Sequence, residues 1–171
     1  NKRIKIIDDP YTGKPMALVP AANPDLAVIH VQKADVYGNA QIWGLALNDS
    51  NIARAAKRVI ITCEEIIATE EIRRMPNMTS IPYYCVDAVV HVPYGSHPFW
   101  NAGCYWCDIP FRRNFMLANK TQAGLEAWIK EWVIDTGDWE AYLQKLGQER
   151  LDKLMKMEQD NYRIPEFVIN G

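Results

Sequence analysis

Two stretches of the sequence decide the fold: Leu26-Ala27-Val28-Ile29-His30-Val31 and Val59-Ile60-Ile61-Thr62-Cys63. Both are short, almost continuously apolar and rich in β-branched residues, as in strands that are covered on both faces of a parallel sheet. A third run of this kind extends from Cys85 to Val92. Helical patterns separate the three runs, and this alternation predicts an α/β fold with an open, largely parallel sheet.

Turn and cap residues mark the elements around these strands. Pro, Gly and Asp crowd residues 9–15 and predict a turn after an opening strand-like piece, and Gly38-Asn39 predicts a turn before an extended segment at 40–43. Residues 48–50 offer N-cap side chains for a helix that ends near Lys57, and Thr69 begins a helix that Pro76 stops. The block at 93–113, rich in Gly, Pro and aromatic residues, is expected to be a long loop.

The carboxy-terminal part of the sequence has helical spacing. Apolar residues recur three and four positions apart from Leu125 to Val133, which predicts an amphipathic helix. Asp138 is expected to begin a second helix, and Gly147 is expected to break or kink it. We therefore predict two parts, an α/β sheet portion at residues 1–120 and a helical carboxy-terminal extension at residues 121–171.

The composition argues against several classes of function. A formal net charge of -2 and a pI near 5.9 provide no basic excess for neutralising phosphates, so neither nucleic acid nor membrane is expected as a partner. No apolar run approaches the roughly 18 residues of a membrane-spanning helix. The four cysteines are interpreted as free thiols, which predicts a reducing, cytoplasmic location. The chain begins at Asn1 and enters an apolar segment at once, so we expect it to be a fragment.

Two adjacent carboxylates, Glu64 and Glu65, directly follow the second predicted strand. Ligands of open α/β sheets collect where the parallel strands end, so this pair is a candidate for substrate binding. Carboxylates at such a place can position a substrate, act as a base, or cap and neutralise a neighbouring helix and arginine. The sequence leaves these alternatives open.

A second candidate, Gly95-Ser96-His97, follows the third predicted strand. Gly95 permits an unusual backbone angle, and Pro98 is expected to hold His97 extended, which can aim the imidazole into a cleft. The alternative is a fixed turn with a hydrogen-bonded histidine. His30 lies inside the first strand and is interpreted as a core or sheet-face histidine, as is His91 in the third strand.

Metal and phosphate motifs give little further guidance. Cys104 and Cys107 have the spacing of a redox or zinc pair, but no second pair or nearby histidine accompanies them, so no metal site is expected. The sequence contains no P-loop, no glycine-rich dinucleotide fingerprint and no GxSxG elbow.

Four blocks of the sequence, taken in order, resemble the A subunit of class I CoA-transferases of the glutaconate type. They are Asp25–Gln32 with Gly38-Asn39, Ala55–Lys57 leading into Ile61–Ile67, Glu70–Arg74, and Val86–Val90 through Pro93–Pro98. The similarity extends from about residue 17 to about residue 155. It implies the α/β fold of the CoA-transferase superfamily and a hetero-oligomer of A and B subunits.

The resemblance also implies an activity. Such enzymes move CoA from an acyl-CoA to a carboxylic acid, here expected to be a dicarboxylate such as glutaconate, through a glutamyl-CoA intermediate. The attacking glutamate ordinarily belongs to the B subunit, so no catalytic residue is expected in this chain. The coenzyme A thioester is expected as a substrate and not as a permanently bound cofactor. A ring-opening CoA-thioester hydrolase subunit of the same fold, or a non-catalytic interaction module, are the alternatives.

Overall fold

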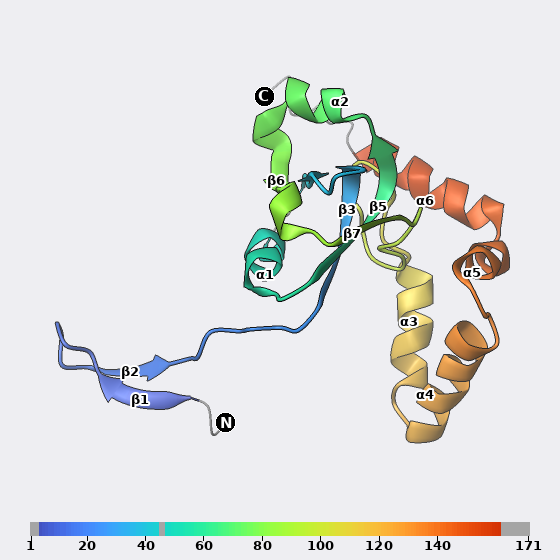
Figure 1. Ribbon diagram of the computed structural model, residues 1–171. Coiled ribbons are helices and arrows are strands. Elements are labelled where there is room, and N and C mark those ends of the chain that lie inside the picture. Colours follow the sequence, from blue (N-terminus) through green and yellow to red (C-terminus); the bar gives the residue numbers. More distant parts are fainter. Residues whose placement is uncertain (1–3, 45–46, 162–171) are drawn as a thin grey trace, which may run out of the picture.

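A five-stranded mixed sheet forms the centre of the protein, with the strand order β6-β4-β3-β5-β7 (Figure 1). The structure is a computed structural model that describes residues 4–44 and 47–161. The two deciding stretches form neighbouring parallel strands, β3 (Ala27–Asp35) and β5 (Val59–Ile67), and β7 (Ala88–His91) continues the parallel arrangement beside β5. The predicted α/β fold with an open sheet is confirmed.

The other half of the sheet is antiparallel. β4 (Ala40–Gln41) pairs with β3, and β6 (Thr79–Ile81) pairs with β4. The extended segment predicted at 40–43 is therefore a strand over its first two residues. β6 was not predicted from the sequence, because three residues are too few to show a strand period.

The main hydrophobic core lies between one face of the sheet and helix α1 (Asp49–Ala55). Ile29, Val31 and Ile61 are at most 5% exposed, and Ala53 of α1 belongs to the same cluster. Each fully buried aliphatic side chain of this size stabilises the fold by about 1.5–3 kcal/mol. Helix α2 (Thr69–Arg74) and the short helices η1 (Pro76–Met78) and η2 (Tyr83–Cys85) border β6. The two helices predicted in this region, after residues 48–50 and from Thr69, are confirmed as α1 and α2.

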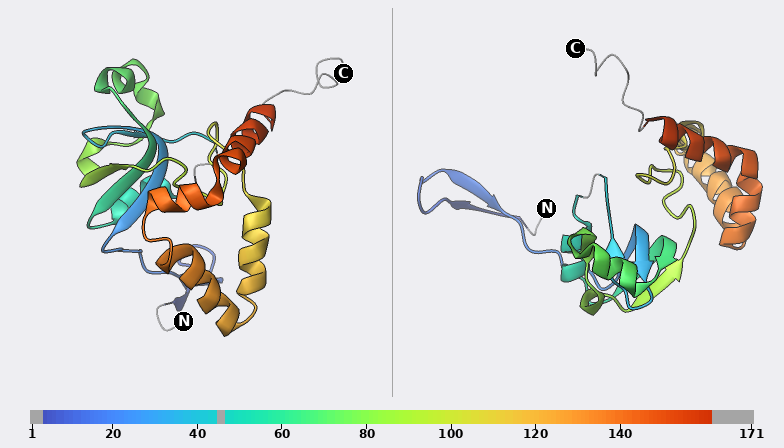
Figure 2. Two further views of the ribbon diagram at one scale, coloured as in Figure 1. Left: turned by 90° about the vertical axis from the view of Figure 1, so that its right-hand side faces the viewer. Right: turned by 90° about the horizontal axis from the view of Figure 1, so that it is seen from above.

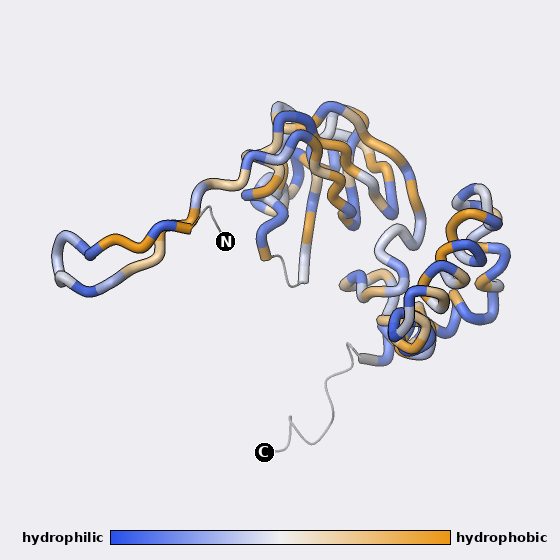
Figure 3. Tube along the Cα trace, turned by 90° about the horizontal axis from the view of Figure 1, so that it is seen from below, coloured by the Kyte–Doolittle hydropathy of each residue, from blue (hydrophilic) through white to orange (hydrophobic). Residues whose placement is uncertain are grey.

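A hairpin of β1 (Lys5–Asp8) and β2 (Pro15–Leu18) extends away from the sheet (Figure 1). Its turn is the predicted one: the Asp9 carboxylate accepts hydrogen bonds from Tyr11 N and Thr12 Oγ1. All eight strand residues are exposed, and Figure 3 shows apolar residues on both strands of the hairpin. An isolated two-stranded hairpin is only marginally stable in water, so this one needs a further surface for its apolar side chains.

The carboxy-terminal helices form a layer beside the sheet (Figures 1 and 2). They are α3 (Ile109–Ala118), α4 (Gln122–Ile129), the π-helix η3 (Lys130–Ile134), α5 (Trp139–Leu146) and α6 (Gln148–Asn161). The ring of Phe111 lies 5.7 Å from that of Trp128 and 4.7 Å from that of Trp132, which joins α3 to the later helices. The predicted helical extension is confirmed up to residue 161, and residues 162–171 lie outside the described part. The division at residue 120 stays a prediction.

Local details differ from the sequence expectations. The third strand, expected from Cys85 to Val92, covers only Ala88–His91, because Cys85 lies in η2. The loop expected at 93–113 ends earlier, because Asp108 caps α3 by accepting a hydrogen bond from Phe111 N and Pro110 lies in the first turn. The helix expected at 125–133 changes to a π-helical turn after Ile129. The cap at Asp138, whose carboxylate accepts from Ala141 N, is confirmed, as is the break at Gly147, where φ is 84°. No helix within residues 4–44 and 47–161 is both long and apolar enough to cross a membrane.

Candidate functional site

Glu64 lies inside β5 and not beyond its end. The expectation that the strand stops at Cys63 was wrong, because β3 extends to Asp35 and continues to pair with β5 as far as Ile67. Side chains alternate along a strand, so Glu64 faces the same side as Thr62 and His30, which is paired with Thr62. This side of the sheet faces the loop between β7 and α3, residues 92–108, which we call the 92–108 loop. Glu65 faces the opposite side, where it forms an exposed ion pair with Lys33. The two adjacent carboxylates therefore do not form one site.

The Glu64 carboxylate is the centre of a hydrogen-bond network. Its Oε1 atom accepts from His30 Nε2 at 2.7 Å, from Asn101 Nδ2 at 2.9 Å and from the Tyr105 hydroxyl at 2.7 Å. Its Oε2 atom accepts from the backbone N–H of Tyr94 at 2.7 Å. A carboxylate has about four acceptor positions, two on each oxygen, so three donors fully occupy Oε1 and one position remains on Oε2.

The network fixes the ionisation of its members. Burial would raise the pKa of the Glu64 carboxyl, but the hydrogen bonds from His30, Tyr105 and Tyr94 outweigh burial and lower this pKa below its ordinary value. Burial, followed by the nearby charge of Glu64, raises the pKa of Tyr105. Glu64 is thus ionised and Tyr105 is protonated at neutral pH. A carboxylate held by four donors and with a lowered pKa is a poor base and a poor nucleophile.

Gly95 and Ser96 belong to the same network through the loop. A Cβ atom on Gly95 would lie 2.5 Å from two ring atoms of His30, so only glycine permits this close approach. The expected unusual backbone angle is not at Gly95: the residue with positive φ is Tyr94, at 60°. The backbone N–H of Ser96 donates to the Tyr105 hydroxyl at 2.8 Å. The Ser96 hydroxyl has no hydrogen-bond partner among the described residues.

A small cavity of about 180 Å³ lies beside this network. Ser96, Asn101 and Trp100 line it from the loop, and His30 and Gln32 line it from β3. Gln32 is held in place because its amide donates to the carbonyls of Trp43 and Ala102. Asp49, at the start of α1, adds an acidic side chain to the lining. The cavity therefore has mostly polar walls that can accept a small polar group.

His97 lies in a separate buried cluster. Its side chain is 1% exposed, Nδ1 lies 2.7 Å from the Tyr142 hydroxyl, and Nε2 lies 3.1 Å from Asp108 Oδ2. Arg150 of α6 donates two hydrogen bonds to the same Asp108 carboxylate. Burial lowers the pKa of His97, and the hydrogen bond with Asp108 opposes that shift. The structure thus places His97 between the loop and the helices, and its imidazole does not line the cavity beside Glu64.

Sequence reasoning missed most partners of Glu64. Asn101 and Tyr105 are 37 and 41 residues away in sequence, and they were placed in a loop without a role. His30 was correctly interpreted as a sheet-face histidine, and the pairing of His30 with Thr62 is the signal that places it near Glu64. His91 Nε2 is 2.9 Å from the Glu64 carbonyl oxygen and also stays within the sheet.

The cysteines take part in packing in the described residues. All four are free thiols, as expected. Cys107 Sγ donates to the Pro98 carbonyl oxygen and accepts from Arg112 Nη1, while burial, with the charges of Glu64 and Glu158, raises the pKa of Cys104 to about 12. Within residues 4–44 and 47–161, no group of three or more His, Cys, Asp or Glu side chains is arranged to hold a metal ion.

Comparison with known proteins gives a consistent result. The family model for coenzyme A transferase matches residues 2–92. The A subunit of glutaconate CoA-transferase from Acidaminococcus fermentans is 45% identical over 163 residues, which cover 95% of this chain and 51% of that protein. The A subunit of 3-oxoadipate CoA-transferase from Pseudomonas knackmussii is 37% identical over 148 residues, which cover 86% of this chain and 52% of that protein.

A solved structure has the same fold. The crystal structure of glutaconate coenzyme A-transferase from Acidaminococcus fermentans superposes with a TM-score of 0.83 and 47% identity, covering 89% of this chain and 48% of the matched chain. The chain therefore spans about half the length of the two curated relatives named here.

Proposed function

The chain belongs to the coenzyme A transferase family, and we propose that it is part of the A subunit of a heteromeric enzyme that moves CoA from an acyl-CoA to a carboxylic acid. The names of both relatives support this activity, and the glutaconate relative favours a dicarboxylate acceptor such as glutaconate. The CoA thioester is a substrate in this proposal, and no permanently bound cofactor is needed. The four free thiols suit a reducing, cytoplasmic location.

In the proposed reaction, the acyl-CoA carbonyl is attacked by a glutamate of the second subunit, the B subunit of the enzyme. The CoA thiolate is released, which leaves an acyl-glutamyl anhydride. The thiolate then attacks the glutamyl carbonyl, giving a glutamyl-CoA thioester and releasing the first carboxylic acid. The acceptor carboxylate reverses both steps. Covalent catalysis of this kind divides one difficult transfer into easier ones.

The observation that carries our assignment of roles is the set of four hydrogen bonds to the Glu64 carboxylate. With four donors bound and a lowered pKa, Glu64 is unsuited to the attack on a thioester, so we assign the nucleophile to the second subunit. Glu64 and Gly95 then act as positioning residues that hold the 92–108 loop against β3. His97 anchors the same loop to the helices.

We assign direct substrate contact to Ser96 and its cavity. The Ser96 hydroxyl is free to bind a carboxylate or carbonyl oxygen, and Asn101 beside it is held by Glu64. Glu65 lies on the opposite face of the sheet, so we assign it no substrate contact, although it was a candidate from the sequence.

The nucleophile is tested by trapping. The intact protein would be purified with its second subunit, incubated with acyl-CoA and treated with borohydride, which reduces a glutamyl thioester. We expect the modified glutamate on the second subunit. Modification of Glu64 would overturn the division of roles.

Two further measurements test the reaction and the cavity. Acyl-CoA consumption should require an added carboxylic acid, and equal consumption without the acid would instead favour the ring-opening hydrolase. Ser96→Ala should raise KM for the acid with little change in thermal stability, while Glu65→Ala on the opposite face should leave KM unchanged. Equal KM values for the two variants would remove Ser96 from the site.

A further inference from the structure

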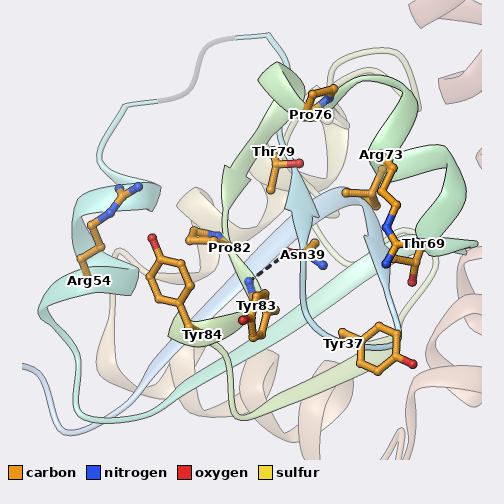
Figure 4. A pocket seen from close by; sticks show the side chains of 11 residues that line it. Tyr37, Asn39, Arg54, Thr69, Arg73, Pro76, Thr79, Pro82, Tyr83 and Tyr84 are labelled. Carbon is orange, nitrogen blue, oxygen red and sulfur yellow. Dashed lines mark hydrogen bonds between the residues drawn. The ribbon is translucent and has the colours of Figure 1, made fainter.

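A second and larger hollow, of about 710 Å³, lies at the β6 edge of the sheet, away from the Glu64 network (Figure 4). The residues that line it include three tyrosines and two arginines: Tyr37, Tyr83, Tyr84, Arg54 and Arg73. We call it the tyrosine–arginine hollow. Its walls come from the turn after β3, from α1 and α2, and from the segment around β6, so segments far apart in sequence meet here.

The hollow is cationic. Among the described residues that line it, none is Asp or Glu. Arg54 donates one side-chain hydrogen bond, from Nη1 to the carbonyl oxygen of Ser50. The side chain of Arg73 has no ion pair or hydrogen bond within the described part of the chain. The Asp35 carboxylate behind the wall is hydrogen-bonded to the lining residues Tyr37 and Asn39 and offsets part of this charge. The two exposed guanidinium groups still leave an excess of positive charge, which attracts anionic groups.

The tyrosine rings lie open to solvent. Tyr37 is 68% exposed, Tyr83 is 58% exposed and Tyr84 is 73% exposed. A small-molecule site usually encloses most of its ligand, which rings this exposed do not do. Tyrosine and arginine are instead enriched at protein interfaces, where they supply much of the binding energy. The open shape and the residue types therefore suit a polypeptide partner.

Hydrogen bonds to the side chains of Asp35 and Asn39 hold the backbone around the hollow in one arrangement. The Asp35 carboxylate, on a residue that is fully buried, accepts from Tyr37 N and from the backbone and side-chain N–H groups of Asn39. The Asn39 side-chain oxygen in turn accepts from Tyr83 N at 3.1 Å, which Figure 4 draws as a dashed line. The backbone at Tyr37 and Tyr83 is thus fixed before any partner binds, and such preorganisation lowers the entropy cost of association.

We propose that the tyrosine–arginine hollow binds an acidic segment of the second subunit. The carboxylates of that segment pair with Arg54 and Arg73, and its apolar groups lie on the tyrosine rings. This inference rests on the proposed function, which supplies the second subunit. It adds the place on this chain that holds the partner and the chemistry of the segment that binds there.

Adjacent arginines provide a matched test. Arg73 lines the hollow, whereas Arg74 is the next residue on the same helix, is also exposed and does not line it. In the intact protein, Arg73→Glu should weaken by about tenfold the affinity for the purified second subunit, equivalent to about 1.4 kcal/mol. Arg74→Glu should change it less than about threefold, since an exposed charge contributes little. Tyr84→Ala should weaken binding to a similar degree as Arg73→Glu, and Tyr11→Ala, at an exposed tyrosine of the hairpin, should not.

A photo-crosslinker at position 84 identifies the occupant. With p-benzoylphenylalanine in place of Tyr84, we expect an adduct to a peptide of the second subunit that contains Asp or Glu. An adduct only within the same chain, or equal affinities of the Arg73→Glu and Arg74→Glu variants, would overturn the proposal. If the unmodified proteins form a complex that transfers CoA and these tests still fail, the hollow is wrong and the proposed function stands. If no complex forms at all, both are wrong.

Discussion

Glu64→Gln tests the reasoning about the candidate site most directly. The substitution keeps the size of the side chain but removes the charge that four donors share. A hydrogen bond to a charged group contributes about 1.5–3 kcal/mol and a neutral one about 0.5–1.5 kcal/mol, so each of the four bonds loses on the order of 1 kcal/mol. The new amide also turns its own donor toward an existing one. Because the side chain is only 13% exposed, water replaces little of this loss. We expect the free energy of unfolding to fall by about 3–5 kcal/mol.

Urea-induced unfolding measures this change. Tryptophan fluorescence is a suitable signal, because Trp100 and Trp106 lie in the 92–108 loop. Glu65→Gln is the matched control: it is the next residue of β5 and breaks only an exposed ion pair with Lys33, worth at most about 1 kcal/mol. If the two variants lose the same stability, the network does not hold the loop and our account of Glu64 is wrong.

The pH dependence gives the same test a second signature. The folded protein lowers the pKa of Glu64 below its ordinary value of 4.5, so ionised Glu64 stabilises the fold. That contribution is complete above about pH 4.5 and is lost as the pH falls through the lowered folded-state pKa. The stability difference between the natural protein and Glu64→Gln should therefore be largest near neutral pH and shrink in acid. A difference that grows as the pH falls would contradict this sign.

Three further substitutions probe the packing around the site. Asp108→Ala removes the hydrogen-bond acceptor of Arg150 and His97. It should lower the free energy of unfolding by about 3–5 kcal/mol, because a partly buried charge loses its partner. A loss below about 1 kcal/mol in thermal unfolding would contradict this. Gly95→Ala would place a Cβ atom 2.5 Å from the His30 ring and 2.9 Å from the Val92 carbonyl oxygen. It should lower the free energy of unfolding by about 1–3 kcal/mol. An unchanged melting temperature would show that His30 can move aside. Trp132→Ala removes the ring packed against Phe111 and should lower the free energy of unfolding by about 3 kcal/mol. The control Ile134→Ala, at a residue 67% exposed, should lower it by about 0.5 kcal/mol or less. Equal losses would mean that the aromatic cluster around Phe111 adds no stability.

Local pattern was enough to predict the parallel strands and most helices. The apolar runs around Ile29 and Ile61 form β3 and β5, and the cap at Asp138 and the break at Gly147 lie where the residue types place them. These features depend on a few neighbouring residues, whose periodicity and cap chemistry are visible in the sequence. Helix α3 had a local signal too, since Asp108 and Pro110 are typical of a helix start, but the surrounding Gly and aromatic residues favoured a loop.

The site was harder to predict because its contacts are long-range. The end of β5 depends on how far β3 continues beside it, so the sequence of β5 alone misplaced Glu64 relative to the strand end. Asn101 and Tyr105 reach Glu64 only after the loop has folded back over the sheet. The spacing of apolar residues along the chain does not indicate such a long-range contact. The sequence correctly indicated that position 95 needs glycine, but for the wrong reason. Glycine is required because His30 lies close to it, and not because its φ is positive.

Polar contacts fix the position of the 92–108 loop in addition to its buried Ala102, Tyr105 and Cys107. Three carboxylates with little exposure each hold a different part of it. Glu64 in β5 accepts from Tyr94 N near its start, Glu158 in α6 accepts from Trp100 Nε1 and Gly103 N in its middle, and Asp108 at its end accepts from Arg150.

Hydrogen bonds have directions, whereas apolar contacts tolerate sliding, so these three anchors define the loop position more narrowly than its apolar packing alone would. The anchors come from the sheet and from the last helix, so the loop can adopt this geometry only when both are in place. We infer that the carboxy-terminal helices contribute to the site by holding this loop over β3, without any of their side chains lining the cavity that contains Ser96.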